Sequence, residues 1–307
     1  MRSRGPIHLA RIAGIDLFLH WSWFLILFYE VGAGNGRYSS LAWNVLEVLA
    51  LFAIVTLHEF GHALACRQVG GTANRILLWP FGGIAFVDVP PRPGATLWTI
   101  AAGPLVNVAL IPLLALVPQP ASLNLATLLQ SVIYINLGLL VFNILPVYPL
   151  DGGQILHALL WFPLGRARSL MATTVIGLIG VALLLLEAAR TRDLWLAAIT
   201  AFILLYCWNG LKHARVLWRM AKLPHHAAFA CPRCRMAPPA AELWRCSNCQ
   251  HSFDPFATAA ACPICATRFE RSQCLECGHW HAMREWANAA AISVAGQRAV
   301  PPALAED

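Results

Sequence analysis

Residues 41–66 read LAWNVLEVLALFAIVTLHEFGHALAC, an almost wholly apolar run that contains His58-Glu59-Phe60-Gly61-His62 near its end. A run of about 20 apolar residues can cross a bilayer as a helix. On a helix, His58 and His62 share a face, so both imidazoles can reach one zinc ion, with Glu59 beside them as a general base. The alternative is a polar cluster near a helix end, but ionisable groups within membrane helices are usually functional.

The whole chain has the composition of a multi-pass membrane protein. Of its 307 residues, 58% are hydrophobic and only 12% are charged, whereas soluble chains carry roughly 25% charged residues. This composition excludes an ordinary soluble enzyme or a disordered chain for most of the sequence. We therefore predict an all-α polytopic membrane protein with six transmembrane helices, at residues 13–31, 41–66, 96–117, 125–145, 168–187 and 194–211.

The basic residues predict the orientation of these helices. The net charge is +7, and cytoplasmic loops are enriched in Lys and Arg. Basic residues precede the first predicted helix and follow the last one, whereas the loop 118–124 has none. Arg190 and Arg192 weaken this pattern in the loop before the last helix. The best fit places both termini in the cytoplasm. If the source is bacterial, the protein would lie in the inner or plasma membrane.

The loop 67–95 contains two strand-like runs. Residues 75–79 and 84–89 are rich in branched and aromatic side chains, and they flank Pro80-Phe81-Gly82-Gly83. This pattern predicts a small β-hairpin or a re-entrant segment.

A catalytic zinc ion usually has three protein ligands, so the two histidines need a third. Asp151 is a candidate because it lies in the segment 143–153, NILPVYPLDGG, whose prolines and glycines permit a non-helical path into the bundle. The same residue could instead cap a following helix, with Gln154 completing a capping box. The residue types alone leave both readings open.

The part after residue 230 contains four C-x-x-C pairs. Two such pairs hold one zinc ion between four thiolates, so four pairs predict a double zinc ribbon with two structural zinc ions. We expect the first pair to join the second and the third to join the fourth. Disulfides are the alternative and would require an oxidising compartment. The predicted ligands are Cys231, Cys234, Cys246, Cys249, Cys262, Cys265, Cys274 and Cys277.

Taken together, the membrane motifs resemble the site-2 protease family of intramembrane zinc metalloproteases. The residues that carry the resemblance are the H-E-F-G-H run at 58–62, the N-x-x-P-x-x-x-L-D-G-G run at 143–153, Gly103-Pro104-Leu-Val-Asn107 and Phe81-Gly-Gly83. It covers about residues 1–215 and matches a compact branch without a PDZ domain, to which the zinc ribbons are an unusual addition.

The resemblance implies a role for each motif. His58, His62 and Asp151 would bind one catalytic zinc ion, and Glu59 would be the catalytic base. Asn143 would help to hold the scissile carbonyl or the peptide backbone. The substrate would be a transmembrane helix of another membrane protein, unwound locally before cleavage. Asn107 would contact the substrate, although a buried Asn107 could simply form a hydrogen bond between helices. The strand-like pattern around the Phe-Gly-Gly turn, and not the resemblance, adds Gly82, Gly83 and Ile84 as substrate-binding residues, because an unwound substrate could pair with this segment as an extra strand. The alternative is a hairpin that only packs on the helix bundle.

The sequence thus predicts a membrane metalloprotease domain at 1–215, a linker at 216–229, a double zinc ribbon at 230–285 and a disordered tail at 286–307. Two other functions use the same features. One is a non-catalytic zinc transporter or sensor, which should have polar residues along several helices. The other is a membrane-tethered nucleic-acid binder, which the acidic residues among the ribbon arginines disfavour. We expect the ribbons to bind a cytoplasmic docking partner and do not expect nucleic acid.

Overall fold

The computed structural model describes residues 6–25, 28, 37–79 and 82–286, and the chain divides into two compact units, Met1–Lys212 and His213–Asp307. The predicted tail at 286–307 lies outside the described residues except for Trp286. The other predicted domain boundaries stay predictions.

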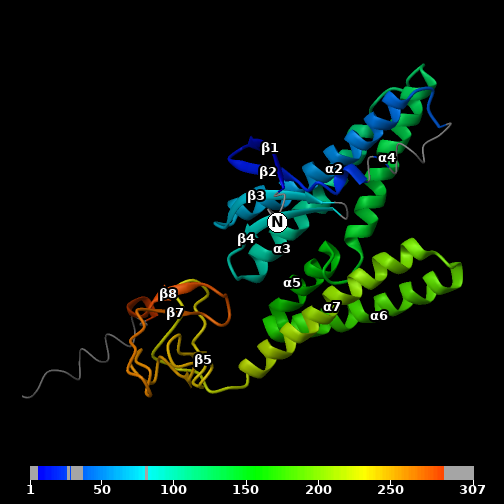
Figure 1. The fold of residues 1–307 in the computed structure, drawn as a ribbon. Coiled ribbons are helices and arrows are strands. Elements are labelled where there is room, and N and C mark those ends of the chain that lie inside the picture. The colour runs from blue at the N-terminus through cyan, green and yellow to red at the C-terminus, as the bar shows by residue number, and fades with distance from the viewer. Residues whose placement is uncertain (1–5, 26–27, 29–36, 80–81, 287–307) are drawn as a thin grey trace, which may run out of the picture. The chain divides into compact units, whose positions relative to one another are not determined.

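Long apolar helices dominate the first unit (Figure 1). Four of them are long and apolar enough to cross a membrane: α2 (Leu41–Gln68), α3 (Pro93–Ala115), α4 (Leu123–Ile144) and α6 (Arg166–Thr191). A shorter helix, α5 (Asp151–Leu164), precedes α6, and α7 (Leu194–Met220) follows it. The chain is therefore an integral membrane protein, while the predicted count of six spans stays a prediction.

The first predicted span, at 13–31, is wrong in its first part. Residues Ile7–Ile12 form strand β1 and Ile15–Leu19 form β2, joined by a turn in which Ala13 and Gly14 have positive φ angles of 51° and 72°. Ile15 and Leu17 are buried, while Asp16 between them is only partly buried. This alternation is typical of a strand. The rest of this predicted span lies largely outside the described residues.

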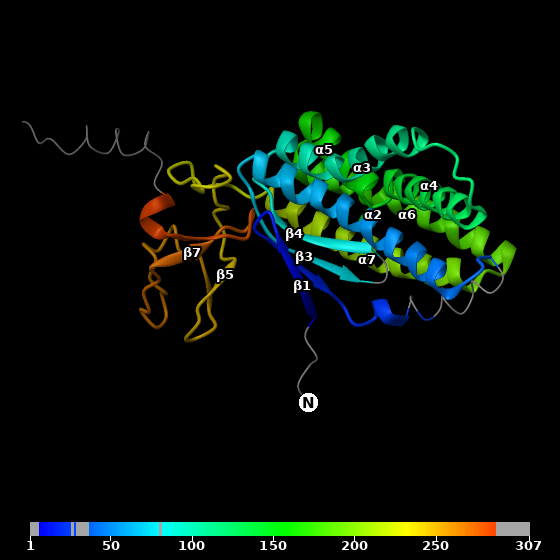
Figure 2. The same ribbon diagram turned by 90° about the horizontal axis from the view of Figure 1, so that it is seen from above.

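The sheet is larger than the predicted hairpin. Strands β3 (Thr72–Trp79) and β4 (Gly82–Asp88) form the antiparallel hairpin expected between 75 and 89, and β2 adds to β3 in parallel. The strand order is β1-β2-β3-β4. Between β2 and β3 the chain runs through α2, the helical crossover that a parallel pair needs. Ile76 and Leu78 of β3 pack with Val55 and Ala63 of α2, so the sheet lies along this helix (Figure 2).

The segment between α4 and α5 turns back tightly on itself. Leu145-Pro146 ends α4, and the buried Val147 packs against α6 and α7. At Gly152 a side chain would collide with the backbone of Ile144, and at Gly153 with that of Val147. The two glycines therefore allow α5 to start close to the end of α4, and this fixes the position of Asp151.

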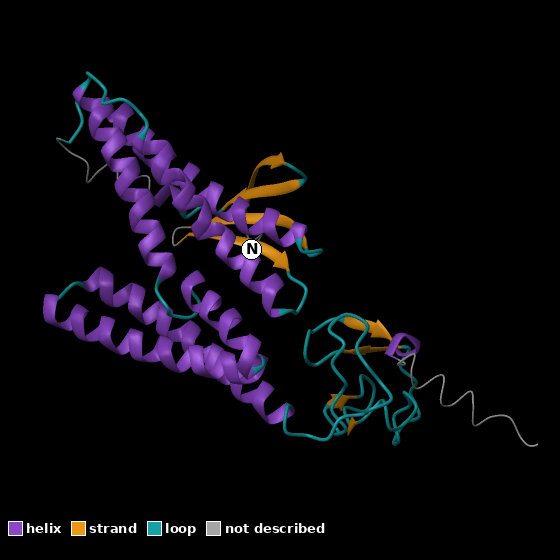
Figure 3. Cartoon of the chain, turned by 180° about the vertical axis from the view of Figure 1, so that it is seen from behind, coloured by secondary structure: helices purple, strands orange, loops and turns teal. Residues whose placement is uncertain are grey.

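The second unit contains little regular structure. Two short antiparallel hairpins, β5 (Trp244–Arg245) with β6 (Ser252–Phe253) and β7 (Arg271–Gln273) with β8 (Trp280–Ala282), precede the short helix η1 (Met283–Trp286) (Figure 3). Its small aromatic core includes Phe256 and the fully buried Trp286.

Candidate metal centre

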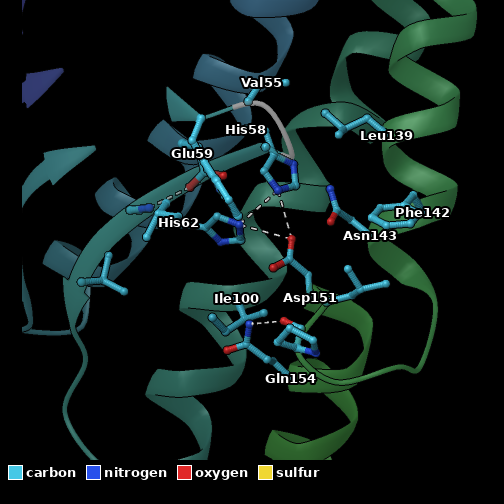
Figure 4. A pocket seen from close by; sticks show the side chains of 18 of the residues that line it. Val55, His58, Glu59, His62, Ile100, Leu139, Phe142, Asn143, Asp151 and Gln154 are labelled. Atoms are coloured by element: carbon cyan, nitrogen blue, oxygen red, sulfur yellow. Dashed lines mark hydrogen bonds and ion pairs between the residues drawn. The ribbon is translucent and has the colours of Figure 1, made fainter. Parts of the chain in front are cut away.

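The structure brings His58, His62 and Asp151 together inside the membrane unit. The two histidines lie one turn apart on α2, and Asp151 is the first residue of α5. The Nε2 atoms of the histidines are 3.1 Å apart, and Asp151 Oδ2 lies 3.0 Å from His58 Nε2 and 3.2 Å from His62 Nε2 (Figure 4). All three residues are buried.

These separations fit a zinc ion. Zinc binds imidazole nitrogen and carboxylate oxygen at about 2.0–2.2 Å, and tetrahedral geometry then places neighbouring ligand atoms about 3.3–3.6 Å apart, a few tenths of an ångström more than the separations here. The donor set also matches, since two imidazoles and one carboxylate make a common catalytic zinc site. The alternative role of Asp151 is not observed: Leu150 is the cap residue of α5, and no side chain forms a capping hydrogen bond.

Hydrogen bonds from neighbouring helices orient both histidines. His62 Nδ1 lies 2.9 Å from the backbone oxygen of Thr99 on α3. A carbonyl can only accept, so His62 donates from Nδ1 and keeps a lone pair on Nε2 for a metal. His58 Nδ1 lies 2.6 Å from Asn107 Oδ1, also on α3.

Two glycines let α2 and α3 approach closely at this level. A side chain at Gly61 would come within 2.7 Å of the backbone oxygen of Ala102. A side chain at Gly103 would collide with the Nε2 atom of His62 and approach that of His58. Gly61 of the H-E-F-G-H run and Gly103 of the G-P-L-V-N run therefore both allow the close contact between α2 and α3.

Glu59 lies on the sheet side of the centre. Its Oε2 atom accepts a hydrogen bond of 3.0 Å from the backbone N–H of Ala85 on β4. A side chain at Gly83 would collide with the Glu59 side chain, so this strand can approach the carboxylate only with glycine there.

A cavity of about 390 Å³ opens beside these residues. Of the residues predicted from the sequence, the three candidate ligands, Glu59, Gly82, Gly83, Ile84 and Asn143 line it. Phe142 and Gln154 also face it, as Figure 4 shows for Gln154 below Asp151.

Asn107 is not among the described residues that line this cavity, and its position fits the alternative of a hydrogen bond between helices. Its side chain is fully buried behind His58 and forms a hydrogen bond with Asn136 of α4. The role of Asn136 was missed, and its only signal in the sequence is an amide within an apolar helix.

The eight ribbon cysteines gather into two groups, but not in the predicted pairing. One group joins the first and fourth pairs, and the other joins the second and third. The groups are Cys231, Cys234, Cys274 and Cys277, and Cys246, Cys249, Cys262 and Cys265. All are free thiols.

Aromatic packing explains the nested pairing. Trp244 packs on Phe256 with ring centroids 5.4 Å apart, and its Nε1 donates to the backbone oxygen of Gln273 at 3.1 Å. The backbone N–H of Ala230 donates to the oxygen of Trp286 at 2.8 Å. These contacts bring the last pair beside the first, and the middle two pairs form their own site between them.

Both groups fit zinc. In both groups, sulfur atoms lie 3.5–3.8 Å apart, near the separation of about 3.8 Å expected for four sulfurs bound at 2.3 Å. Burial and the neighbouring thiols raise the pKa of Cys277 to about 12. A bound zinc ion would favour the thiolate form of these cysteines, because a metal ligand has to be deprotonated.

Comparison with known proteins supports a peptidase. A model of peptidase family M50 matches residues 46–121 and 115–187. A zinc metalloprotease of Methanocaldococcus jannaschii is 34% identical over 199 residues, which cover 64% of this chain and 58% of that protein. The Mycobacterium tuberculosis protein Rip3 is 31% identical over 227 residues, 65% of this chain and 57% of Rip3. The chain thus spans less than two thirds of the length of these curated relatives.

A solved structure, the site-2 protease from Methanocaldococcus jannaschii, is 28% identical to this chain. The match covers 67% of this chain and 95% of that chain, with a TM-score of 0.47.

Proposed function

The membrane part of this chain belongs to peptidase family M50, the site-2 protease family, and on this premise we propose that the protein is an intramembrane zinc endopeptidase that cleaves transmembrane segments of other membrane proteins. One observation carries the proposal. The donor atoms of His58, His62 and Asp151 lie within 3.2 Å of one another, with Glu59 beside them on the wall of the same cavity.

His58, His62 and Asp151 would hold the catalytic zinc ion. When bound, zinc makes water acidic enough to attack near neutral pH and polarises the scissile carbonyl. Burial of the three residues lowers the local dielectric constant and so strengthens their electrostatic interactions.

Glu59 is the proposed general base. Its carboxylate takes a proton from the attacking water and then delivers it to the leaving amine of the substrate. Asn143 lines the same cavity, where its amide can donate a hydrogen bond to the substrate carbonyl as negative charge develops.

The sheet edge is the proposed binding surface for the unwound substrate. Among the strands that the structure describes, β4 pairs with β3 alone, and on its other side the N–H of Ala85 points toward Glu59. An extended segment that adds to this edge would form backbone hydrogen bonds independent of its sequence and would pass the metal centre. Gly82, Gly83 and Ile84 lie at the same place and would contact it.

The two cysteine groups would hold two structural zinc ions, which gives three zinc ions per chain. We further propose that both termini are cytoplasmic and that the ribbons dock a cytoplasmic partner. A transporter or sensor could use the three membrane ligands, but it would have no need of a carboxylate placed as Glu59 is.

The test combines metal content with cleavage in the purified full-length protein. We expect three zinc ions in the wild type, two in His58→Ala with Asp151→Ala, and three in Glu59→Gln. Glu59→Gln should slow cleavage of a helical transmembrane peptide by roughly 10²–10⁴-fold, as loss of a general base does. Three zinc ions in the double variant, or wild-type cleavage by Glu59→Gln, would contradict the proposal.

A further inference from the structure

A chain of two buried amides connects His58 to a backbone carbonyl. Asn107 of α3 and Asn136 of α4 have exposed fractions of 0% and 1%. Asn136 Nδ2 lies 3.0 Å from the backbone oxygen of Asn107, and Asn136 Oδ1 lies 2.8 Å from Asn107 Nδ2. Asn107 Oδ1 then lies 2.6 Å from His58 Nδ1. Neither asparagine lines the cavity among the described residues.

The backbone carbonyl fixes the direction of every hydrogen bond in this chain. Because the carbonyl of Asn107 can only accept, the NH₂ group of Asn136 must face it, which leaves Oδ1 of Asn136 as an acceptor. The side chain of Asn107 must therefore present its own NH₂ group to that oxygen. Its Oδ1 atom is then turned toward His58, which has to donate.

The consequence is a single tautomer of His58. With the proton held on Nδ1, the lone pair on Nε2 points at Asp151 Oδ2 and His62 Nε2, where a metal ligand is needed. The other tautomer would place two acceptors, His58 Nδ1 and Asn107 Oδ1, face to face in a buried site, which is costly. His62 is held in the same tautomer, because its Nδ1 donates directly to the backbone carbonyl of Thr99.

We propose that Asn136 is a positioning residue, which acts through Asn107 to set the tautomer of His58 and thereby the affinity of the membrane site for zinc. This inference rests on the proposed function. It differs from an ordinary amide contact between helices, since such a contact would stabilise the bundle without any effect on metal binding.

The chain offers a matched pair of variants and a control on the same helix. Asn136→Leu removes both polar groups at similar size. Asn136→Asp can restore the same directions when protonated, because its hydroxyl donates to the Asn107 carbonyl and its C=O accepts from Asn107 Nδ2. Ser131→Ala removes another buried polar group of α4, one whose partners are Arg37, Tyr38 and the backbone oxygen of Thr127 and not the metal centre.

The experiment is competition with a chelator for zinc in the full-length protein, with the stoichiometry of each variant measured in parallel. Removal of groups that orient zinc ligands costs 10- to 100-fold in affinity, so we expect Asn136→Leu to weaken the membrane site about tenfold or more. Asn136→Asp should recover most of this loss, and Ser131→Ala should retain wild-type affinity. In zinc-free protein with ¹⁵N-labelled imidazoles, His58 should show the Nδ1–H tautomer in the wild type and a mixture in Asn136→Leu.

The outcomes separate this inference from the proposed function. Wild-type affinity in Asn136→Leu, while His58→Ala loses one zinc ion, would overturn the inference alone. Equal weakening by Ser131→Ala, or by Asn136→Asp and Asn136→Leu alike, would also overturn it, since the effect would then report general loosening of α4. A wild-type protein whose zinc content does not depend on His58 would overturn both.

Discussion

The carboxylate of Glu59 on α2 accepts a hydrogen bond of 3.0 Å from the backbone N–H of Ala85 on β4. This donor lies on the open edge of the sheet, where the unwound substrate is proposed to bind. A substrate strand that paired with β4 would use the same N–H group for its own carbonyl. Substrate binding would then free the Glu59 carboxylate at the moment when it is needed as a base.

Ala85→Pro should reduce cleavage while the sheet stays folded. Along β4 the backbone N–H groups point alternately to the two sides, so the N–H of Ala85 faces the cavity and that of Phe86 faces β3. Loss of one backbone hydrogen bond to substrate should cost about 1 kcal/mol, or about fivefold in kcat/KM. The comparison is Phe86→Pro, which should break the hairpin and lower the unfolding temperature. Unchanged kcat/KM in Ala85→Pro would argue against strand addition at this edge.

Gly103→Ala should impair zinc binding at the membrane site through steric contact alone. The new methyl group would collide with the imidazole of His62 and approach that of His58, so one ring or the α3 backbone has to move. Overpacking of this kind costs about 1–3 kcal/mol, and we expect zinc affinity to fall roughly 10- to 100-fold. Gly138→Ala on α4 is the matched control, because a methyl group there meets nothing within 4 Å. Equal zinc affinity in both variants would contradict this reading of the packing.

Asp151→Asn separates a ligand from a helix cap. Asn caps helices about as well as Asp does, so a capping role would survive the substitution. A ligand role would not, because a neutral amide is a much weaker zinc donor than a carboxylate. In the absence of zinc, we expect the variant to unfold at the same temperature as the zinc-free wild type. Loaded with zinc, the variant should hold two zinc ions per chain in place of three. Retention of three zinc ions would show that Asp151 is not a zinc ligand.

The sequence was sufficient to pick out the three candidate metal ligands that the structure brings together, but not the buried amides that hold His58 in place. His58, Glu59 and His62 lie within one helical turn, and the tight turn that carries Asp151 is marked by prolines and glycines. The pairing of Asn107 with Asn136 depends on how α3 and α4 are rotated against each other, which no local pattern contains. The partner of an intramembrane amide could therefore be found only from the structure.

The N-terminal strands were missed for a different reason. Residues 15–19 read IDLFL, in which only Asp16 is polar, and after His20 and Ser22 they continue into residues typical of a membrane helix. A strand buried against α2 has the same composition as the beginning of a transmembrane helix, so hydropathy does not distinguish them. The distinguishing signal was the Ala13-Gly14 turn, which is too short to outweigh the apolar run.

The nested arrangement of the zinc ribbons can be tested by counting zinc ions. In the structure Cys231 and Cys274 belong to one group, while Cys231 and Cys246 belong to different groups. Cys231→Ser with Cys274→Ser should therefore cost one zinc ion per chain, and Cys231→Ser with Cys246→Ser should cost two, since a site that loses one of four thiolates binds zinc far more weakly. Pairing of neighbours along the chain predicts the reverse result. Both variants remove two cysteines and share Cys231→Ser, so a difference between them reports which thiolates bind the same ion. The membrane site serves as the internal reference, because its single zinc ion should remain in both variants.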